Sequence, residues 1–581
     1  MMPAGSLEHH GDFDAFIYRR GFLLLPTGVG PDPDTWAARV TQGWVRVSLQ
    51  GFDLLASPEV PLSLGHARDR TVALVGRAVD PYGNTADHEA ISRSLAECAS
   101  EHAFLERLDD LTGRFVVLES DIGGLRLYQD AVGMQTVFYA RPGLEAVAAS
   151  HALLVGEVVG RGVDDGARIF LADIAATRPS ELSVKWLPGV MTPVTDVLAL
   201  TPNTRLEVGP QRVSRFWPRS PRRPGLRVGP VIAEMHDVMR TALALVGAAQ
   251  PLRMSLTAGL DSRVTLACLK GQIDNVTFFS HVNSDNPDEG NTHRVDLALA
   301  SDLAQRFGLA HHIVEMGPAI DAMPGREPFE RAWLQNVGLP LGLRRLVRSY
   351  ALSWPGEALH IRSNVAEIGR ANQSYHRAGL LGGAFDESVL ARVWAPKLSG
   401  DARAHSAFRE FKDLTRFDRE HLLGYHAADL FYWEQRIGMW HALLCLESAM
   451  SHDTFTAYDN RRLLASLLRL PYGVRADARV FAGVIDRAWP ELMAFPINPP
   501  EWPEVPPQPE AARRRVAVSR IRLTGVQRRV RGIRARIKRK TQMLKQSPRL
   551  RRTVSLMLGG RRSPVSRWIG RLIDGRAVRS R

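Results

Sequence analysis

Apolar residues in the first third of the chain come in short runs separated by turn residues. Six of these runs predict strands bounded by Gly, Pro or Asp, at residues 44–49, 71–76, 114–118, 125–128, 136–139 and 144–149. Two stretches with helical spacing, residues 89–107 and 167–174, interrupt the strands. The pattern therefore predicts an α+β layer domain over residues 1–217, followed by a linker rich in Pro and Arg at residues 218–230.

After the linker, predicted strands alternate with predicted helices. An amphipathic helix begins near Val231; strands follow at 252–256, 276–280 and 312–315, with helices at 262–270 and 294–307 between them. This alternation predicts a parallel sheet with crossover helices. Residues 328–492 have mostly helical spacing, so we expect an α/β parallel-sheet domain over residues 231–495 with a helical C-terminal part. A proline-rich hinge at 496–510 and an arm at 511–581 follow.

The strongest candidate for chemistry is the sequence SLTAGLDSR at residues 255–263, between a predicted strand and a predicted helix. Small residues let the backbone turn sharply toward a ligand, and the helix N-terminus offers unpaired N–H groups that suit phosphate. Thr257 and Ser262 add hydroxyl donors, and Asp261 supplies a hard oxygen ligand for Mg²⁺. The alternative is a polar turn in which Asp261 or Ser262 only caps the helix. The strand before it and the βαβ continuation after it favour a nucleotide loop.

The sequence TAGLDS at 257–262 resembles the pyrophosphate loop of ATP pyrophosphatases, in particular that of the asparagine synthetase family. The resemblance extends in order over roughly residues 12–495, and its other motifs are GRF (113–115), DAVG (130–133), LPG (187–189) and RFW (215–217). It implies an N-terminal layer like that of glutaminases of the Ntn-hydrolase type, followed by an ATP pyrophosphatase domain. Members of the family adenylate a carboxylate with ATP and then form an amide with ammonia or an amine.

The resemblance also implies which residues bind ATP and Mg²⁺. Those that would surround the nucleotide are Leu256, Thr257, Gly259, Ser262, Ser280, Arg362 and Ser363. Asp261 is the implied metal ligand. The implied catalytic residues are Asp261, Glu367 and Arg479. Arg479, or alternatively Arg475, would replace a late lysine of the family that this chain lacks, since a guanidinium also pairs with phosphate.

Departures from the family pattern narrow the expected activity. Glutamine-hydrolysing members carry a Cys nucleophile at the mature N-terminus, whereas this chain begins MMPAG and its first cysteine is Cys98, inside a predicted helix. We therefore expect no glutaminase activity and a structural or docking role for the N-terminal layer. Ala366 stands where a metal-binding Asp is expected, which would weaken an Mg²⁺ site.

Two functions of different classes stay open at this point. The first is an ATP-dependent ligase that joins a small-molecule or peptide carboxylate to ammonia or an amine donor. The second is a non-catalytic protein of the same origin that binds a nucleotide or a partner. Ala366 and the missing lysine favour the second, whereas the retained Asp261 favours the first.

Charge divides the chain into two parts. Residues 511–581 hold 21 Arg, 3 Lys and one acidic residue, a net charge of +23; because the whole chain carries +14, residues 1–510 carry −9. The basic pI therefore belongs to the arm and does not indicate a nucleic-acid-binding core. Three interpretations of the arm stay open: a solvated extension, a basic amphipathic helix on an anionic membrane, or a ligand for an acidic partner, with nucleic acid the least favoured.

Three scattered cysteines argue against a disulfide scaffold or a zinc cluster. The sequence shows neither a signal peptide nor an apolar run long enough to span a membrane. We therefore expect a cytoplasmic protein. Peripheral contact with a membrane through the arm stays open as an alternative.

Overall fold

The structure is a computed structural model of the chain, and it describes residues 13–176, 186–282, 290–315, 325–338, 344–353, 358–371 and 385–499. The chain divides into two compact units, Met1–Pro507 and Gln508–Arg581. All described residues belong to the first unit. The predicted arm and most of the predicted hinge lie outside the described residues.

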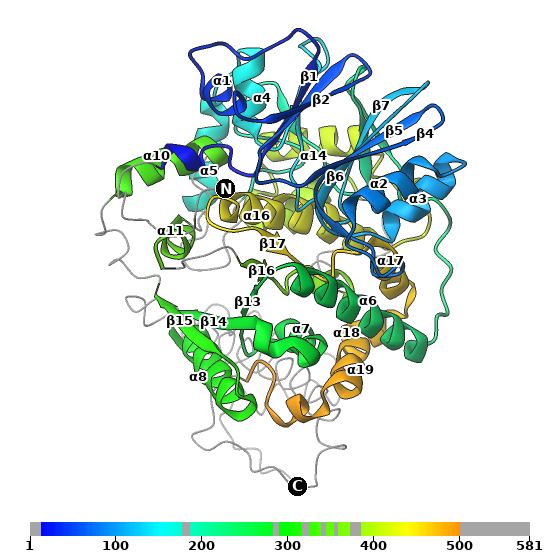
Figure 1. Cartoon of the computed structure of the whole chain (residues 1–581), viewed down its shortest axis with the longest axis vertical. Coiled ribbons are helices and arrows are strands. Elements are labelled where there is room, and N and C mark those ends of the chain that lie inside the picture. Colours follow the sequence, from blue (N-terminus) through cyan, green and yellow to red (C-terminus); the bar gives the residue numbers. More distant parts are fainter. Residues whose placement is uncertain are drawn as a thin grey trace, which may run out of the picture. The chain divides into compact units, whose positions relative to one another are not determined.

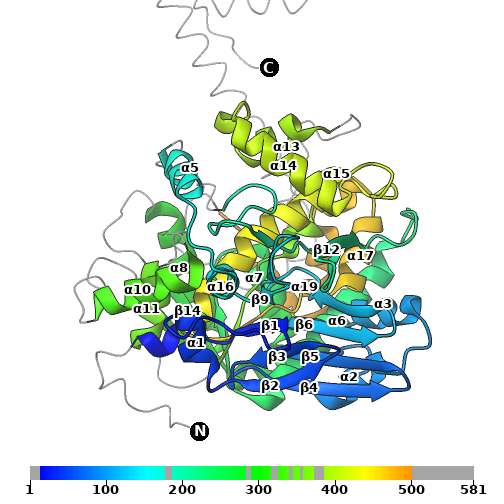
Figure 2. The same ribbon diagram turned by 90° about the horizontal axis from the view of Figure 1, so that it is seen from above.

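The first part of the chain forms two antiparallel six-stranded sheets, which lie next to each other in both views (Figure 1, Figure 2). Their strand orders are β10-β8-β9-β1-β3-β2 and β12-β11-β7-β6-β5-β4. The strands are β1 Phe22–Pro26, β2 Val45–Leu49, β3 Phe52–Ala56, β4 Leu62–Ala67, β5 Arg70–Val79, β6 Thr112–Asp121, β7 Gly124–Gln129, β8 Phe138–Ala140, β9 Ala148–Ala149, β10 Val197–Ala199, β11 Thr204–Glu207 and β12 Arg212–Arg215. The helices of this part are α1 Trp36–Thr41, α2 His88–Ala96, α3 Glu101–Asp109, α4 Ala152–Val159 and α5 Asp165–Ala176.

A two-residue turn fixes the register of the hairpin formed by β2 and β3. Gln50 and Gly51 both have positive φ, 45° and 81°. Such a turn follows the right-handed twist of the strands it joins. It pairs Leu49 with Phe52, the residues on either side of the turn.

The predicted bounds of two elements in this layer were wrong. The helix expected at 89–107 is two helices, α2 and α3, because Ser100 accepts a hydrogen bond from the N–H of Ala103 (3.1 Å) and starts a new helix. Cys98 therefore lies in the turn between them and not inside a helix. The strand expected at 144–149 is reduced to β9, since only two residues there pair with neighbouring strands.

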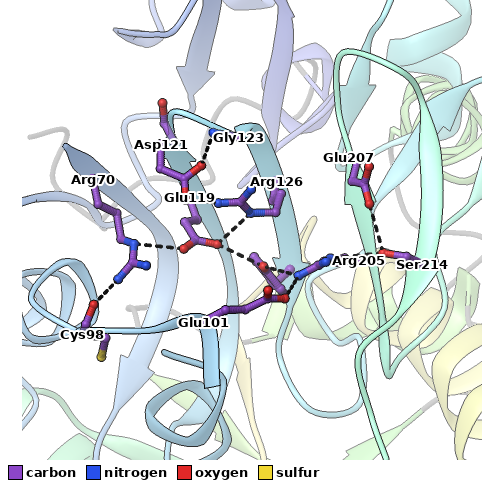
Figure 3. Close-up of polar contacts among 12 residues, drawn as sticks. Arg70, Cys98, Glu101, Glu119, Asp121, Gly123, Arg126, Arg205, Glu207 and Ser214 are labelled. Atoms are coloured by element: carbon purple, nitrogen blue, oxygen red, sulfur yellow. Dashed lines mark hydrogen bonds and ion pairs between the residues drawn. The ribbon is translucent and has the colours of Figure 1, made fainter. Parts of the chain in front are cut away.

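A buried carboxylate joins three elements of the second sheet (Figure 3). Glu119 on β6 is 1% exposed, and it accepts hydrogen bonds from Arg126 Nε and the Tyr128 hydroxyl, both at 3.0 Å. Its other oxygen forms an ion pair with Arg70 Nε at 3.0 Å. Arg205 on β11 donates to the Tyr128 hydroxyl (3.1 Å) and also pairs with the first residue of α3. The network thus links β5, β6, β7, β11 and α3.

The second part of the chain forms a five-stranded sheet and the helices around it (Figure 1). Its order is β15-β14-β13-β16-β17, and every neighbouring pair is parallel. The strands are β13 Leu252–Ser255, β14 Val276–Val282, β15 His311–Glu315, β16 Leu359–Ile361 and β17 Thr454–Phe455. The helices are α6 Val228–Ala249, α7 Leu260–Cys268, α8 Gly290–Phe307, α10 Arg326–Val337, α11 Arg344–Ser353, α13 Glu387–Trp394, α14 Ala402–Thr415, α15 Ala427–Phe431, α16 Ala442–Ser448, α17 Arg461–Arg469, α18 Tyr472–Ala476 and α19 Arg479–Ala488.

These elements confirm the coarse prediction of a mixed α and β chain with a parallel sheet in its second part, and they show that the sheets of the first layer are antiparallel. The three strands predicted for the second part are β13, β14 and β15. The mostly helical region holds two further short strands, β16 and β17, which the sequence did not reveal. The helix expected near Val231 begins at Val228, inside the predicted linker. Among the described residues, no helix is long and apolar enough to cross a membrane.

The two parts meet through buried ion pairs. Arg461, which is 1% exposed, donates to Asp109 (3.2 Å) and to the side-chain oxygen of Asn203 (3.3 Å). Arg215 forms a two-pronged pair with Glu434 at 2.6 and 2.8 Å. Since Asp109, Asn203 and Arg215 come from the antiparallel layer and their partners from the helical part, these pairs join the two parts within one compact unit.

Candidate functional site

The predicted nucleotide loop lies at the carboxyl end of the central parallel strand. The backbone N–H of Leu256 donates to the carbonyl of Phe279 (2.7 Å), which continues the β13–β14 ladder by one residue. The chain then turns through residues 257–259, and α7 begins at Leu260, two residues earlier than predicted. The N-terminus of α7 therefore faces the edge of the sheet, as a phosphate-binding turn requires.

Two predicted hydroxyls meet inside this loop. Thr257 Oγ1 and Ser262 Oγ are 2.8 Å apart, and the N–H of Gly259 donates to Thr257 Oγ1 at 3.2 Å. A side chain at Gly259 would place its Cβ 3.1 Å from the same Oγ1 atom. The loop is thus closely packed around these two hydroxyls, and glycine relieves the crowding.

Asp261 is the charged centre of the site. Its Oδ2 accepts a hydrogen bond from Arg370 Nη2 at 2.5 Å. Arg370 and Glu367 lie at the end of the segment after β16, around the short helical turn η3 Ala366–Ile368. Glu367 is half-buried and close enough to affect the charge of both Asp261 and Arg370. The structure thus brings the predicted Asp261 and Glu367 together, with an arginine that the prediction did not include.

Burial raises the pKa of Asp261 to about 7; Arg370 opposes this shift and the carboxylate of Glu367 adds to it. The pKa of Arg370 is raised, since its two acidic neighbours outweigh the effect of burial. The Asp261 Oδ1 atom and the Arg370 Nε atom are both buried without a hydrogen-bond partner among the described residues. Buried polar atoms are normally paired, so this pair of atoms marks a place where a ligand can supply partners.

Leu256 and Ser280, predicted to flank the adenosine, lie side by side. Ser280 Oγ donates to the carbonyl of Leu256 (2.7 Å) and is 3.0 Å from Nε2 of His311. Both Leu256 and Ser280 are buried. This hydrogen bond holds the ends of β13 and β14 together beside the loop.

Arg362 and Ser363 follow β16 directly. Ser363 Oγ donates to Thr265 Oγ1 on α7 (2.9 Å), which ties the segment after β16 to the helix after β13. Arg362 lies near the buried His441 and His452, whose pKa values are lowered first by burial and then by its positive charge. No hydrogen bond or ion pair between described residues joins Arg362 to Asp261.

Neither candidate for the missing lysine forms an ion pair with Asp261 in the described structure. Arg479 is exposed at the first position of α19, and its side chain makes no hydrogen bond or ion pair with any described residue. Arg475 is buried and paired with Asp429 at 2.7 Å. Arg370 is therefore the cation that the described structure places at Asp261.

Aromatic side chains that the prediction did not include enclose the charged centre. The Arg370 guanidinium lies 5.8 Å from the ring centre of Phe481 on α19. Phe481 stacks on Tyr458, whose hydroxyl donates to the backbone carbonyl of Asp261 (3.0 Å). These rings are distant in sequence from the loop, and no sequence motif pointed to them.

The C-terminal segment of the described chain covers part of the loop. The N–H of Asn498 donates to the carbonyl of Ala258 at 3.0 Å. The buried Arg263 donates to backbone carbonyls of Leu492, Phe495 and Pro496 at 3.1–3.2 Å. The first residues of the predicted hinge are thus held against the candidate site.

The described structure leaves few ligands for an Mg²⁺ ion. Asp261 already accepts from a guanidinium, Ala366 offers no oxygen ligand, and Glu367 is the remaining carboxylate. Over the described ranges, no three His, Cys, Asp or Glu side chains gather in an arrangement that could hold a metal ion. Mg²⁺ beside phosphate usually takes one or two protein carboxylates. Here Asp261 is already paired with Arg370, which leaves Glu367 as the second carboxylate of the predicted site.

No protein-family model matches the chain, and no curated protein matches it significantly. Among solved structures, the chain is similar to glutamine phosphoribosylpyrophosphate (PRPP) amidotransferase from B. subtilis complexed with ADP and GMP. The two are 12% identical with a TM-score of 0.21, and the match covers 53% of this chain and 61% of that chain. So weak a likeness decides neither fold nor function; the fold is described by the strand order and the contacts above.

Proposed function

We propose that the chain binds a nucleotide at the carboxyl edge of its parallel sheet and uses it to activate a carboxylate for amide formation. One observation carries this proposal: the ion pair between Asp261 and Arg370 (2.5 Å) joins the segment after β13 to the segment after β16. Between β13 and β16 the strand order reverses. Open α/β sheets bind their ligands in the crevice at this switch point.

The charges and donors at this edge suit the phosphates of ATP. The N-terminus of α7, the hydroxyls of Thr257 and Ser262, and the Arg370 guanidinium are all donors to negatively charged oxygens. Leu256 and Ser280 lie beside them, where the resemblance to ATP pyrophosphatases would place the adenosine. In this proposal the second part is an ATP pyrophosphatase domain, and the antiparallel layer is an Ntn-type glutaminase layer without its nucleophile.

The reaction class comes from the sequence resemblance to asparagine synthetases. A carboxylate oxygen of a small-molecule or peptide substrate would attack the α-phosphorus of ATP, and pyrophosphate would leave. Ammonia or an amine would then attack the acyl carbon of the adenylate, so that an amide forms and AMP leaves. The donors at the loop would stabilise the charge that builds on the phosphate oxygens. No step in this scheme is assigned to a metal ion.

A non-catalytic nucleotide-binding protein is the second candidate, and a specific observation favours it. The predicted metal ligand Asp261 is paired with Arg370, and among the described residues neither Arg479 nor Arg475 forms an ion pair with it. A site that has lost its metal ligands can keep affinity for a nucleotide after losing catalysis.

Two measurements on the full chain distinguish the candidates. ATP–pyrophosphate exchange with a panel of carboxylates, together with ATP binding by calorimetry, would be compared for wild type, Asp261→Ala and the control Asp274→Ala, an exposed acid after α7. Exchange that requires Asp261 and is unchanged in the control supports the ligase. ATP binding without exchange for any acid supports the non-catalytic protein. A chain that neither binds ATP nor catalyses exchange contradicts both.

A further inference from the structure

The charged centre at Asp261 contains its own cation. Arg370 donates one N–H to Asp261, and its side chain is 26% exposed, so solvent reaches part of it. A guanidinium has five N–H donors, and one Asp oxygen uses one of them. The remaining donors include the buried Nε atom, which has no partner among the described residues.

A divalent cation would compete with this arrangement. Bound at the free Oδ1 atom of Asp261, it would lie within a few ångströms of a guanidinium that already holds Oδ2 of the same carboxylate. Like charges at that separation repel strongly in a partly buried site. Glu367 adds one carboxylate and Ala366 adds none, so without the phosphates of a nucleotide the two acids do not neutralise a divalent cation and Arg370 together.

A phosphate group would satisfy the unpaired donor. Phosphate oxygens are acceptors that guanidinium groups bind with two parallel hydrogen bonds. The ring of Phe481, 5.8 Å from the guanidinium, limits the directions that the Arg370 side chain can take. Asp261 lies in the first turn of α7, so Arg370 and the N-terminus of this helix both bring positive charge to the same edge of the sheet.

We propose that Arg370 takes the place of the divalent cation at this site, so that the phosphates of a nucleoside triphosphate bind without a metal ion. This inference rests on the proposed nucleotide binding and specifies its chemistry. Arg370 is then a substrate-binding residue, and Asp261 holds it in position.

Calorimetry of ATP with the full chain, in excess Mg²⁺ and in EDTA, tests the inference. The Kd in EDTA is expected to lie within about tenfold of the Kd in Mg²⁺. Binding that disappears in EDTA and returns with Mg²⁺ would overturn the metal-free site while leaving nucleotide binding intact. Absence of binding under both conditions would overturn the proposed function as well, so the two failures are distinguishable.

Variants at Arg370 sharpen the test. Arg370→Ala is expected to raise the Kd for ATP in EDTA by about tenfold or more, and Arg370→Lys by less, because the lysine keeps the charge without the fork geometry. Arg306→Ala, at an exposed arginine on α8, is the control and should bind as wild type does. If Arg370→Ala binds ATP unchanged in EDTA, Arg370 is not the phosphate cation. The comparison of wild type in Mg²⁺ and EDTA stands even if Arg370→Ala does not fold.

Discussion

Asp261 shows how the surroundings of one side chain decide what a sequence motif can do. In the printed sequence it belongs to a loop that resembles a metal-assisted ATP site. In the structure it is a buried acid whose near neighbours are the cation of Arg370 and the carboxylate of Glu367. Burial and Glu367 favour the protonated form of Asp261, whereas Arg370 favours the ionised form. The balance makes the carboxyl sensitive to pH in the neutral range.

The raised pKa of Asp261 predicts a pH-dependent stability. Its folded pKa is about 7 and its ordinary value is 3.8, so the folded state holds the proton more tightly. The stability that this group contributes is therefore greatest at low pH and is lost as pH rises toward 7 and above. Between pH 5 and pH 8 the free energy of unfolding of wild type should fall by roughly 2–3 kcal/mol relative to that of Asp261→Asn, which cannot titrate. Urea unfolding of both proteins at the two pH values measures this difference.

An equal change in both proteins would contradict the raised pKa. Asp274→Asn, at an exposed acid, is the matched control, and its difference from wild type should stay constant with pH.

The contact of Arg370 with Asp261 is the feature of the site that the sequence could not predict. The motif at 257–262 predicted the position of Asp261, and the resemblance to the asparagine synthetase family suggested Glu367. Nothing local indicated that Arg370 would fold back onto Asp261, because their contact spans 109 positions of the chain. Arg479 was assigned from the absence of a lysine; the structure places it on the surface of α19.

At the scale of elements, Arg263 on α7 holds the C-terminal segment against the nucleotide loop. It is 1% exposed, and burial lowers its pKa to about 10, so it stays charged at neutral pH. Replacing it with Met removes three hydrogen bonds to backbone carbonyls and should cost about 2–4 kcal/mol. Amide exchange at Asn498, which donates to the loop, should accelerate. Denaturant unfolding and hydrogen exchange measure the two effects.

Arg306→Met, on the exposed face of α8, is the control for Arg263→Met. It should change neither the free energy of unfolding nor the rate of amide exchange at Asn498. If Arg263→Met unfolds at the wild-type denaturant midpoint, the arginine does not hold the segment in place.

Glu119 is expected to stabilise the second antiparallel sheet, as Arg263 is expected to stabilise the contact of the C-terminal segment with the loop. Glu119→Gln removes the charge that faces Arg70 and Arg126, so that Arg70 loses its carboxylate partner and Arg126 keeps only Asp121 (Figure 3). Breaking such a pair from one side typically costs about 3–5 kcal/mol. Thermal or denaturant unfolding should show a loss of this order, whereas Glu106→Gln, at an exposed acid of α3, should leave stability within about 0.5 kcal/mol. Equal midpoints for the two variants would contradict the structural role of Glu119.

The elements that the sequence predicted well are those with long, regular patterns. Strands β13 to β15 alternate with helices of nine or more residues, so their apolar periodicity is distinct. Strands β16 and β17 have three and two residues and lie among amphipathic helices, where so short a run carries no periodicity of its own. They determine the position of the site because β16 carries the segment that ends at Arg370. The break between α2 and α3 was missed because helical spacing continues across it.

At the scale of the whole chain, the two described parts depend on each other. Arg461 is buried between them with Asp109 and Asn203, and the pair of Arg215 with Glu434 crosses the same boundary. A buried charge without its partner is costly, so neither part exposes this surface without loss. The antiparallel layer therefore supports the helices of the second part that carry Glu434 and Arg461.

The charge distribution of the whole chain makes a prediction about the arm, which lies outside the described residues. The arm carries +23 and residues 1–510 carry −9, so an anionic surface should attract the arm and repel the rest. Full-length protein should cosediment with vesicles that contain an anionic lipid at low salt, and a chain ending at residue 510 should not. Because the Debye length shortens to about 10 Å at 0.1 M ionic strength, added salt should release the full-length protein. Zwitterionic vesicles are the control; a full-length protein that stays in the supernatant at low salt would leave the arm as a solvated extension.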